Sequence, residues 1–242
     1  MKEPAITVKD LEITYKTVKK YSIKRNLLRM KPVETKKVEA VRGVSFEVEK
    51  GEILGIIGKN GSGKSTMLKA LANIFSADAG TIDLHGNSIS LLAIGVGFMG
   101  DLTGRENIML SGLVLGFSEA EVEAHMDDII AFADLGDFID MPVRTYSSGM
   151  YSKLAFSVTA ILETDIMLID EVLSVGDESF KKKSYGKMKE LISDGDRTVV
   201  IVSHNLGTLQ ELCDRVLWLN DGEVRMCGDT KEVLNAYREF MK

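Results

Sequence analysis

The stretch that most constrains this chain is a glycine-rich loop between two apolar segments, Gly58-Lys59-Asn60-Gly61-Ser62-Gly63-Lys64-Ser65-Thr66. It matches the pattern G-x-x-x-x-G-K-[ST], whose backbone N–H groups surround phosphate oxygens. Residues 52–57 predict a short buried strand before the loop, and residues 66–71 predict the first turns of a helix after it. This strand–loop–helix context favours a nucleotide phosphate site over an accidental glycine-rich turn.

Each residue type in the loop has a physical role. The glycines let the backbone curl so that successive N–H groups point at one anion, and the helix N-terminus adds the positive end of its dipole. We expect Lys64 to reach the β- and γ-phosphates of ATP and the Ser65 hydroxyl to bind Mg²⁺. The predicted phosphate-binding residues are Gly58, Asn60, Gly61, Ser62, Gly63, Lys64, Ser65 and Thr66.

Composition narrows the class of protein. With 242 residues, 45% of them hydrophobic, the chain can bury the core of one large domain or two small ones. A net charge of −6 argues against a general nucleic-acid binder. Cys213 and Cys227 indicate two reduced thiols of a cytosolic protein. We find neither a secretory signal nor an apolar run near the ~20 residues of a spanning helix, so any work at a membrane is expected to need a partner.

Strands and helices alternate at both ends of the chain, and a helical block interrupts the middle. Apolar–polar alternation at residues 6–15 and 44–48 predicts an N-terminal antiparallel sheet. Residues 106–138 change to helical spacing, with Ser118 opening a capping segment. The other predicted elements are a strand at 81–84, a helix after residue 149, buried parallel strands at 165–170 and 198–203, a hairpin at 215–225 across Asn220-Asp221, and a helix from Asp229.

A basic stretch separates the first two predicted strands. Residues 16–37 hold nine lysines and arginines and one acid, Glu34. One interpretation is a solvated insertion with a short helix near residues 23–30. The other is a surface that faces anionic lipid head groups or a phosphorylated substrate. The sequence leaves both open.

Three polar residues follow the two buried strands. Asp170 is expected to hold Mg²⁺, usually through water, and Glu171 to polarise the attacking water. The alternative is a pair of acids that cap a strand. His204 follows the next strand, where its imidazole could donate a hydrogen bond to the γ-phosphate or orient the water; a structural histidine is its alternative.

The segment Tyr146-Ser147-Ser148-Gly149-Met150 precedes an amphipathic helix. A serine and a glycine N–H at a helix N-terminus suit an anion, and an ordinary N-cap is the alternative. Together with the loop, Leu168-Ile169-Asp170-Glu171, Ser174-Val175-Gly176-Asp177 and Ser203-His204, this segment makes the chain resemble the nucleotide-binding subunit of an ABC transporter over essentially its whole length.

The resemblance implies further residue roles. Ser147, Ser148 and Gly149 stand at the signature sequence, which serves the ATP held by a second copy, although Tyr146 and Met150 replace its leucine and glutamine. Asp177 matches the D-loop aspartate, and Tyr15 the aromatic residue that stacks on adenine. Residues 91–108 are most similar to exporters of O-antigen, capsule and teichoic acid, and they lack the Q-loop glutamine, with Ala93 where a polar residue is expected.

The resemblance also implies a fold: an α/β P-loop NTPase (RecA-like) core with an N-terminal antiparallel β-subdomain and an inserted α-helical subdomain. We expect one nucleotide-binding domain over 1–242, with the core at 1–94 and 161–242 and the helical subdomain at 95–160. Phe98 and Leu102 are interpreted either as docking anchors for a permease or as core residues.

The expected function is ATP hydrolysis coupled to export of a lipid-linked cell-surface glycopolymer across the cytoplasmic membrane, with ATP and Mg²⁺ bound. The expected partners are a second copy in a head-to-tail dimer and a transmembrane permease that holds the chain at the cytoplasmic face; nucleic acid is not expected. Alternative functions are an exporter of lipid or drug and a soluble ABC ATPase that acts on nucleic acid.

Overall fold

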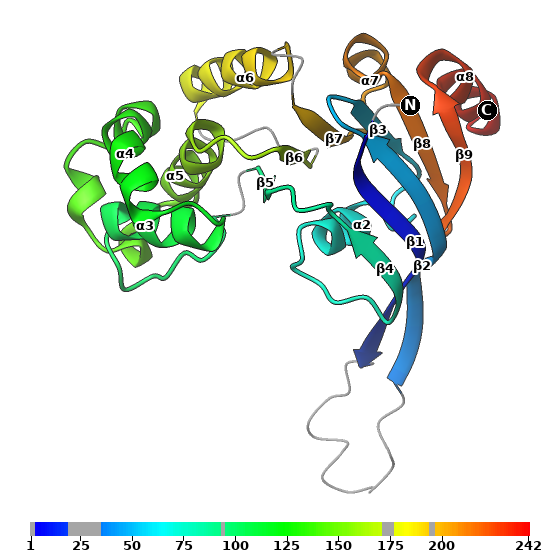
Figure 1. Ribbon diagram of the computed structural model, residues 1–242, viewed down its shortest axis with the longest axis horizontal. Coiled ribbons are helices and arrows are strands. Elements are labelled where there is room, and N and C mark those ends of the chain that lie inside the picture. The colour runs from blue at the N-terminus through cyan, green and yellow to red at the C-terminus, as the bar shows by residue number, and fades with distance from the viewer. Residues whose placement is uncertain (1–2, 19–34, 93–94, 171–176, 194–196) are drawn as a thin grey trace, which may run out of the picture.

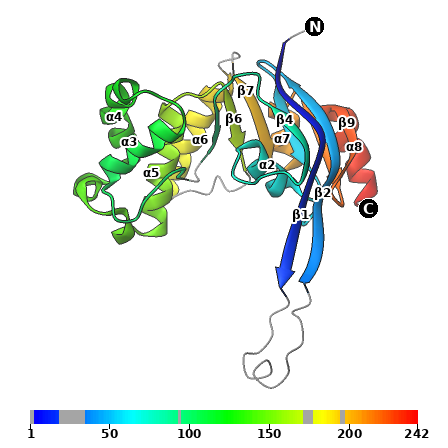
Figure 2. The ribbon, with the colours of Figure 1, turned by 60° about the horizontal axis from the view of Figure 1, so that its bottom comes forward.

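The computed structural model describes residues 3–18, 35–92, 95–170, 177–193 and 197–242. Within these ranges, a three-stranded antiparallel sheet in the order β2-β1-β4 is built from β1 (Pro4–Val18), β2 (Thr35–Glu49) and β4 (Ala79–Asp83). The two long strands β1 and β2 pair from Pro4 to Val18 and run past the body of the molecule as an arm (Figures 1 and 2). The N-terminal antiparallel sheet predicted from alternation is therefore present, and β2 begins nine residues earlier than predicted.

A six-stranded sheet of the described residues forms the centre of the molecule, in the order β5-β6-β7-β3-β8-β9. Its strands are β5 (Ile89–Leu91), β6 (Ile166–Ile169), β7 (Thr198–Val202), β3 (Ile53–Ile57), β8 (Arg215–Asn220) and β9 (Glu223–Asp229). The strands from β5 to β8 pair in parallel, and β9 pairs antiparallel with β8. The carboxyl ends of the parallel strands therefore meet at one edge, where open α/β sheets bind ligands.

Both faces of this sheet are covered, which explains the near-continuous apolar runs in its strands. Leu54 and Ile56 of β3 face the antiparallel sheet and helix α2 (Lys64–Leu71). Ile57, the next residue, faces the opposite way. The helices on its side are α6 (Glu178–Ser193), α7 (Leu206–Leu212) and α8 (Thr230–Phe240).

The helical block forms a third apolar cluster to one side of the sheets (Figure 1). It consists of α3 (Gly104–Val114), α4 (Glu119–Ala133) and α5 (Ser148–Ile161), with the short 3-10 turns η1 (Gly136–Asp140) and η2 (Val143–Thr145). Both α3 and α4 begin with a capping box, in which the side chains of Thr103 and Ser118 each accept an N–H bond from the glutamate three residues later. No helix in the described ranges is long and apolar enough to cross a bilayer.

Two predicted details are wrong. Helix α3 begins at Gly104 rather than Glu106, because Thr103 is its N-cap. The hairpin between β8 and β9 turns at Asp221-Gly222 rather than Asn220-Asp221, since these two residues have φ angles of 49° and 85°. Two successive positive φ angles are what a two-residue hairpin turn of type I′ requires. The helix proposed near residues 23–30, and most of the basic stretch, lie outside the described residues.

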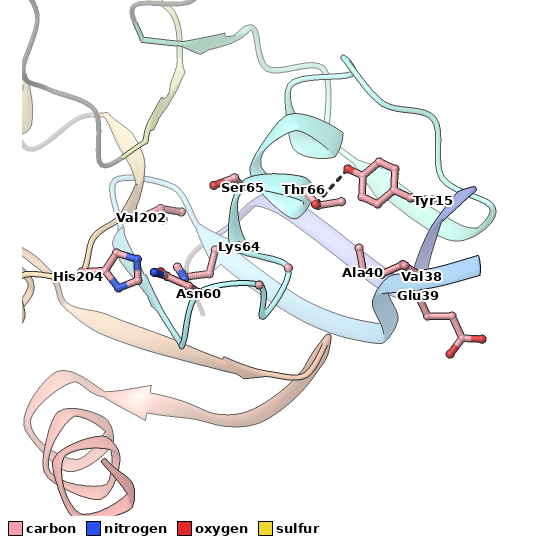
Figure 3. Close-up of a pocket in the computed structure, with 12 residues that line it drawn as sticks. Tyr15, Val38, Glu39, Ala40, Asn60, Lys64, Ser65, Thr66, Val202 and His204 are labelled. Atoms are coloured by element: carbon pink, nitrogen blue, oxygen red, sulfur yellow. Dashed lines mark hydrogen bonds between the residues drawn. The ribbon is translucent and has the colours of Figure 1, made fainter. Parts of the chain in front are cut away.

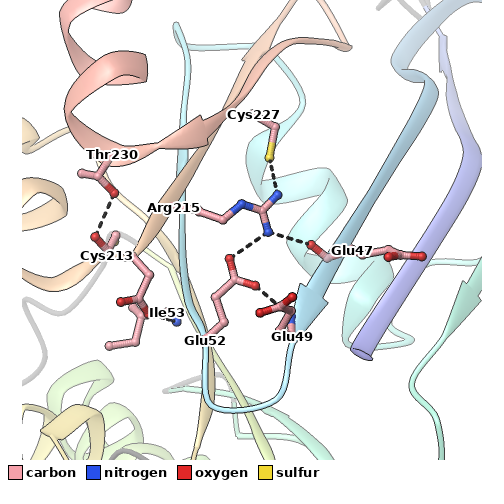
Figure 4. Close-up of polar contacts among 9 residues, drawn as sticks. Glu47, Glu49, Glu52, Ile53, Cys213, Arg215, Cys227 and Thr230 are labelled. Atoms are coloured by element: carbon pink, nitrogen blue, oxygen red, sulfur yellow. Dashed lines mark hydrogen bonds and ion pairs between the residues drawn. The ribbon is translucent and has the colours of Figure 1, made fainter. Parts of the chain in front are cut away.

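An ion pair between the buried Glu52 and the partly exposed Arg215 ties the two sheets together (Figure 4). The Glu52 side chain, 5% exposed, accepts a bond of 3.0 Å from the Arg215 guanidinium of β8 and one of 2.8 Å from the Glu49 N–H at the end of β2. Arg215 also donates to the Cys227 sulfur at 3.3 Å. Burial raises the pKa of the Cys227 thiol, against the opposing effect of Arg215, and raises that of Cys213 to about 12. At neutral pH the Cys213 thiol is therefore protonated and a poor nucleophile.

Candidate nucleotide-binding site

The glycine-rich loop joins β3 to α2, as its pattern predicts. Gly63 is the N-cap of α2 with φ 101° and ψ −3°, and Gly61 has φ 83°. Such left-handed conformations suit glycine. A Cβ atom at Gly63 would collide with the Ala40 carbonyl oxygen, and one at Gly58 with the carbonyl oxygen of Leu219. Glycine is thus required here both for the conformation and for the close approach of neighbouring backbone.

Lys64 is folded back into the loop. Its side chain is almost fully buried, and Nζ donates to the carbonyl oxygens of Gly58 at 2.8 Å and Lys59 at 3.0 Å. The Lys59 carbonyl also accepts a bond of 3.1 Å from the Ser62 N–H. The Lys64 ammonium therefore lies at the N-terminus of α2, where the sequence pattern predicts that phosphate binds.

The Ser62 hydroxyl is an orphaned polar group. Ser62 is 2% exposed, and its Oγ has no hydrogen-bond partner among the described residues. An unsatisfied buried hydroxyl costs about 1–3 kcal/mol. A phosphate oxygen bound in the loop could accept this bond, so the residues present fit a phosphate group.

A cavity of about 490 Å³ opens over the loop, a size in the usual range for small-molecule sites. Figure 3 shows Lys64, Asn60 and His204 at one end and Tyr15 at the other. The Tyr15 hydroxyl donates to Thr66 Oγ1 at 3.0 Å, and its ring meets the Phe75 ring edge-on at 5.8 Å between centroids. The cavity thus offers cationic and aromatic ends, and its lining residues are Tyr15, Val38, Glu39, Ala40, Asn60, Gly61, Gly63, Lys64, Ser65, Thr66, Val202 and His204.

Sequence reasoning missed Val38 and Ala40 on β2. Val38 pairs across the strands with Tyr15, and 41% of its surface is exposed at the cavity. A large apolar side chain left exposed beside an aromatic ring suits a flat apolar group such as a nucleobase. The available signal was the apolar–polar–apolar order of Val38, Glu39 and Ala40, a short strand-like pattern upstream of the predicted strand at 44–48.

The two buried strands that precede Asp170 and His204 lie at different places in the sheet. His204 follows β7, the direct neighbour of β3, and lines the cavity. Asp170 follows β6, which β7 separates from β3, and is not among the residues that line it. The strand that precedes Asp170 thus lies one place further from β3 than the strand that precedes His204, and the predicted role of Asp170 as a Mg²⁺ ligand stays a prediction. Glu171 lies outside the described residues.

The predicted signature residues lie away from this cavity. Ser147 is the N-cap of α5, and its hydroxyl accepts the Met150 N–H at 3.2 Å. Ser147 thus caps α5, and its predicted role toward the ATP of a second copy stays a prediction. Ser148 and Gly149 form the first turn of α5, and neither lines the cavity of its own chain.

Asp177 links the start of α6 to helix α5. Its carboxylate lies 2.6 Å from the Lys153 Nζ and accepts the Phe180 N–H at 2.9 Å. The Lys153 side chain is only 16% exposed, whereas that of Asp177 is 58% exposed. The bond from Lys153, and then that from Phe180, lower the pKa of Asp177 from 3.8 to about 2.

This shift predicts a contribution to acid stability. Because the folded pKa is depressed, stabilisation by Asp177 is full above about pH 3.8 and is lost as the pH falls toward 2. Asp177→Asn should therefore lower the melting temperature at neutral pH, and the difference from the unmodified chain should shrink over that acid range. Thermal unfolding followed by circular dichroism checks this, with the exposed Asp127→Asn on α4 as control. A difference that is constant down to pH 2 would contradict it.

Phe98 contributes to the helical block. Its ring is half-buried and meets the Tyr151 ring of α5 edge-on at 5.2 Å between centroids. The core interpretation of Phe98 therefore has direct support. Met99 and Val114 are the most exposed of the large apolar side chains described in this region, at 56% and 54%.

Comparison with known proteins identifies the family. The sequence pattern described as ABC transporter matches residues 41–174, more than half of the chain. The teichoic acids export ATP-binding protein of Listeria innocua is 42% identical over 97% of this chain and 72% of its own length.

The chain belongs to the ABC transporter family.

Other ABC transporter proteins match over a smaller share of their own length. The O-antigen export system ATP-binding protein of Myxococcus xanthus is 50% identical over 84% of this chain and 46% of its own length. A teichoic acids export ATP-binding protein of Lactiplantibacillus plantarum is 47% identical over 87% of this chain and 57% of its own length. The chain thus spans about half the length of these two relatives.

Solved ABC structures show the same fold. An ATP-binding subunit of an ABC transporter superposes with a TM-score of 0.72 at 22% identity, covering 96% of this chain and 93% of that chain. A dimeric ATP-binding cassette bound to ADP and Pi superposes with a TM-score of 0.68 at 21% identity, covering 93% of this chain and 98% of that chain. These likenesses confirm the predicted fold class, the P-loop NTPase core with its antiparallel sheet and inserted helices. The residue limits of the helical subdomain, 95–160, stay a prediction.

Proposed function

We propose that this chain binds ATP and Mg²⁺ and hydrolyses ATP at the cytoplasmic face of the cell membrane, driving export of a lipid-linked surface glycopolymer through a separate permease. The observation that carries ATP binding is the cavity over the glycine-rich loop, with Lys64 and an orphaned Ser62 hydroxyl at one end and Tyr15 at the other. The names of the relatives support the export of O-antigen or teichoic acid.

The proposed chemistry divides among the residues of the loop and the sheet edge. Lys64 would exchange its carbonyl partners for phosphate oxygens, which bind an ammonium more strongly because the hydrogen bond is charge-assisted on both sides. Ser65 and Asp170 would hold Mg²⁺, which when bound bridges phosphate oxygens and neutralises their charge. Glu171 would polarise the attacking water, and His204, at the cavity wall, would orient it or donate to the γ-phosphate.

Tyr15 and Val38 would hold the adenine. They are cross-strand partners, and both line the cavity at the end away from Lys64. The Tyr15 hydroxyl is already held by Thr66, so the ring has a defined orientation before nucleotide arrives. Such preorganisation reduces the entropy lost on binding.

A second copy would complete the site. Ser148 and Gly149 lie outside the cavity of their own chain, and Ser148 is exposed at the start of a fourteen-residue helix. A helix N-terminus is suited to an anion, and the ATP of another copy is the anion that the resemblance assigns to it. We therefore propose a head-to-tail dimer in which each ATP contacts the loop of one chain and the α5 N-terminus of the other.

Assembly should depend on nucleotide. We expect the purified chain to be mainly monomeric and Glu171→Gln with ATP to shift toward dimer, because ATP supplies charge-assisted bonds that the empty faces lack. Light scattering at high protein concentration measures the shift. The double variant with Ser148→Arg is the control, since it should bind ATP yet stay monomeric. A Glu171→Gln variant whose mass does not respond to ATP would contradict the dimer.

The export proposal is tested in cells that make this protein. Depletion should remove a surface glycopolymer and leave its lipid-linked precursor inside. The measurement is fractionation of glycopolymer between surface and interior, with restored expression as control. Normal surface polymer without internal accumulation would defeat the polysaccharide proposal and favour export of lipid or drug.

A further inference from the structure

The end of helix α8 contacts the glycine-rich loop. The Lys59 Nζ lies 4.5 Å from the centroid of the Phe240 ring, and the Arg225 guanidinium of β9 lies 4.7 Å from the same centroid. Phe240 also packs on Trp218 of β8, with 5.1 Å between ring centroids. A lysine of the loop is therefore in cation–π geometry with an aromatic ring from the last turn of α8.

The position of Phe240 is set by the packing of its helix. Asp229 caps α8 through the N–H groups of Lys231 and Glu232. Val233, Leu234 and Tyr237 are buried, and the Tyr237 ring meets Trp218 edge-on at 5.4 Å. Phe240 lies three residues beyond Tyr237 and so extends the same helix face. The ring that meets Lys59 thus belongs to a well-anchored helix.

Lys59 is an important backbone position in the loop. Its carbonyl oxygen accepts bonds from the Ser62 N–H at 3.1 Å and from the Lys64 Nζ at 3.0 Å. A shift of the Lys59 backbone would therefore move the carbonyl oxygen that holds the Lys64 ammonium in place. The contact between Lys59 and Phe240 restrains Lys59, and so helps to hold the carbonyl oxygen that accepts the bonds from Ser62 and Lys64.

We propose that Phe240 is a positioning residue for nucleotide binding: its ring holds Lys59, and Lys59 in turn holds Ser62 and Lys64 in the geometry that receives phosphate. The C-terminal helix is thereby coupled to ATP affinity, although it does not line the ATP cavity. This inference rests on the proposed ATP binding.

The first experiment measures the contact without nucleotide. The nucleotide-free protein is treated with a limiting amount of an amine-reactive acetylating reagent. Mass spectrometry follows the rate of acetylation of Lys59 relative to that of Lys69. Phe240→Leu should raise the relative rate at least about twofold, since the cation–π contact is lost. Phe240→Tyr, which keeps a π face, and Met241→Ala, the exposed neighbour, should leave it unchanged. An equal rate in Phe240→Leu would overturn the proposal.

The second experiment measures affinity for a non-hydrolysable ATP analogue by calorimetry. Because Lys59 and Phe240 are both exposed, Phe240→Leu and Lys59→Met should each weaken binding by about two- to fivefold, and the double variant no further, since both remove one interaction. Phe240→Tyr should restore affinity, and equal melting temperatures establish that the variants are folded. Additive losses, or unchanged affinity in Phe240→Leu, would overturn the proposal. If the unmodified chain binds no analogue, the proposed function fails, while the labelling experiment still decides the contact.

Discussion

Glu171→Gln is expected to bind ATP with nearly unchanged affinity and to hydrolyse it at least about a hundredfold more slowly, the usual effect of losing a general base. The amide keeps the size of the side chain and loses the negative charge that polarises water. Glu171 follows Asp170 in the sequence, and Asp170 itself follows β6 of the parallel sheet. The measurement pairs steady-state phosphate release with nucleotide affinity, so that a loss of catalysis is separated from a loss of binding.

Two further variants sharpen this test. Glu178→Gln, seven residues later in the sequence and in the first turn of α6, changes an exposed carboxylate and should keep full turnover. His204→Ala should reduce turnover less than Glu171→Gln, because His204 is proposed to orient water or phosphate rather than to accept a proton. Turnover of Glu171→Gln equal to that of the unmodified enzyme would show that another group activates the water.

Lys64→Met should weaken ATP binding about ten- to a hundredfold, as expected for losing hydrogen bonds of a charged group worth about 1.5–3 kcal/mol. Lys64 is buried at the start of α2, so its ammonium meets phosphate where solvent screens it little. Methionine has nearly the same length and packing volume and removes the charge. Calorimetry with a non-hydrolysable ATP analogue measures the loss.

The matched control is Lys69→Met. Lys69 is on the same helix, does not line the cavity, and has its Nζ 5.6 Å from the Phe75 ring centroid. Lys69→Met removes the same charge as Lys64→Met, so any general electrostatic effect on affinity for the ATP analogue appears in both variants. Equal losses of affinity in the two variants would contradict the role of Lys64. Melting temperatures measured alongside guard against a folding defect, since the Gly58 and Lys59 carbonyls lose a donor.

The glycine-rich loop was predictable because its geometry is local. Gly61 and Gly63 have positive φ angles, and Lys64 folds back onto carbonyls five and six residues earlier. Such contacts are encoded within one short stretch. The antiparallel sheet, the helix caps at Ser118 and Asp229 and the buried strands were predictable for the same reason, from periodicity and capping patterns.

The remaining parts of the site depend on tertiary packing. Val38 joins the cavity only because β2 pairs with β1 in the register that sets it opposite Tyr15. The strand before Asp170 is not the direct neighbour of β3, because β7 lies between β6 and β3. The ring of Phe240 reaches Lys59 through the packing of α8 on Trp218. A periodic pattern can indicate that a segment such as β2 is a strand, but it does not give the partner or register, because residues far apart in the chain create these arrangements.

The place of β3 in the sheet has a consequence for synthesis on the ribosome. Its two neighbours, β7 and β8, begin at Thr198 and Arg215, whereas β3 ends at Ile57. During translation both edges of this apolar strand lack their native partners until the 141 residues from Ile57 to Thr198 have been added, and at about 5–20 residues per second the wait lasts roughly 7–28 seconds. Over that interval β3 is open to non-native pairing. Nascent chains stalled before Thr198 should therefore depend on chaperones more than chains released after Asn220.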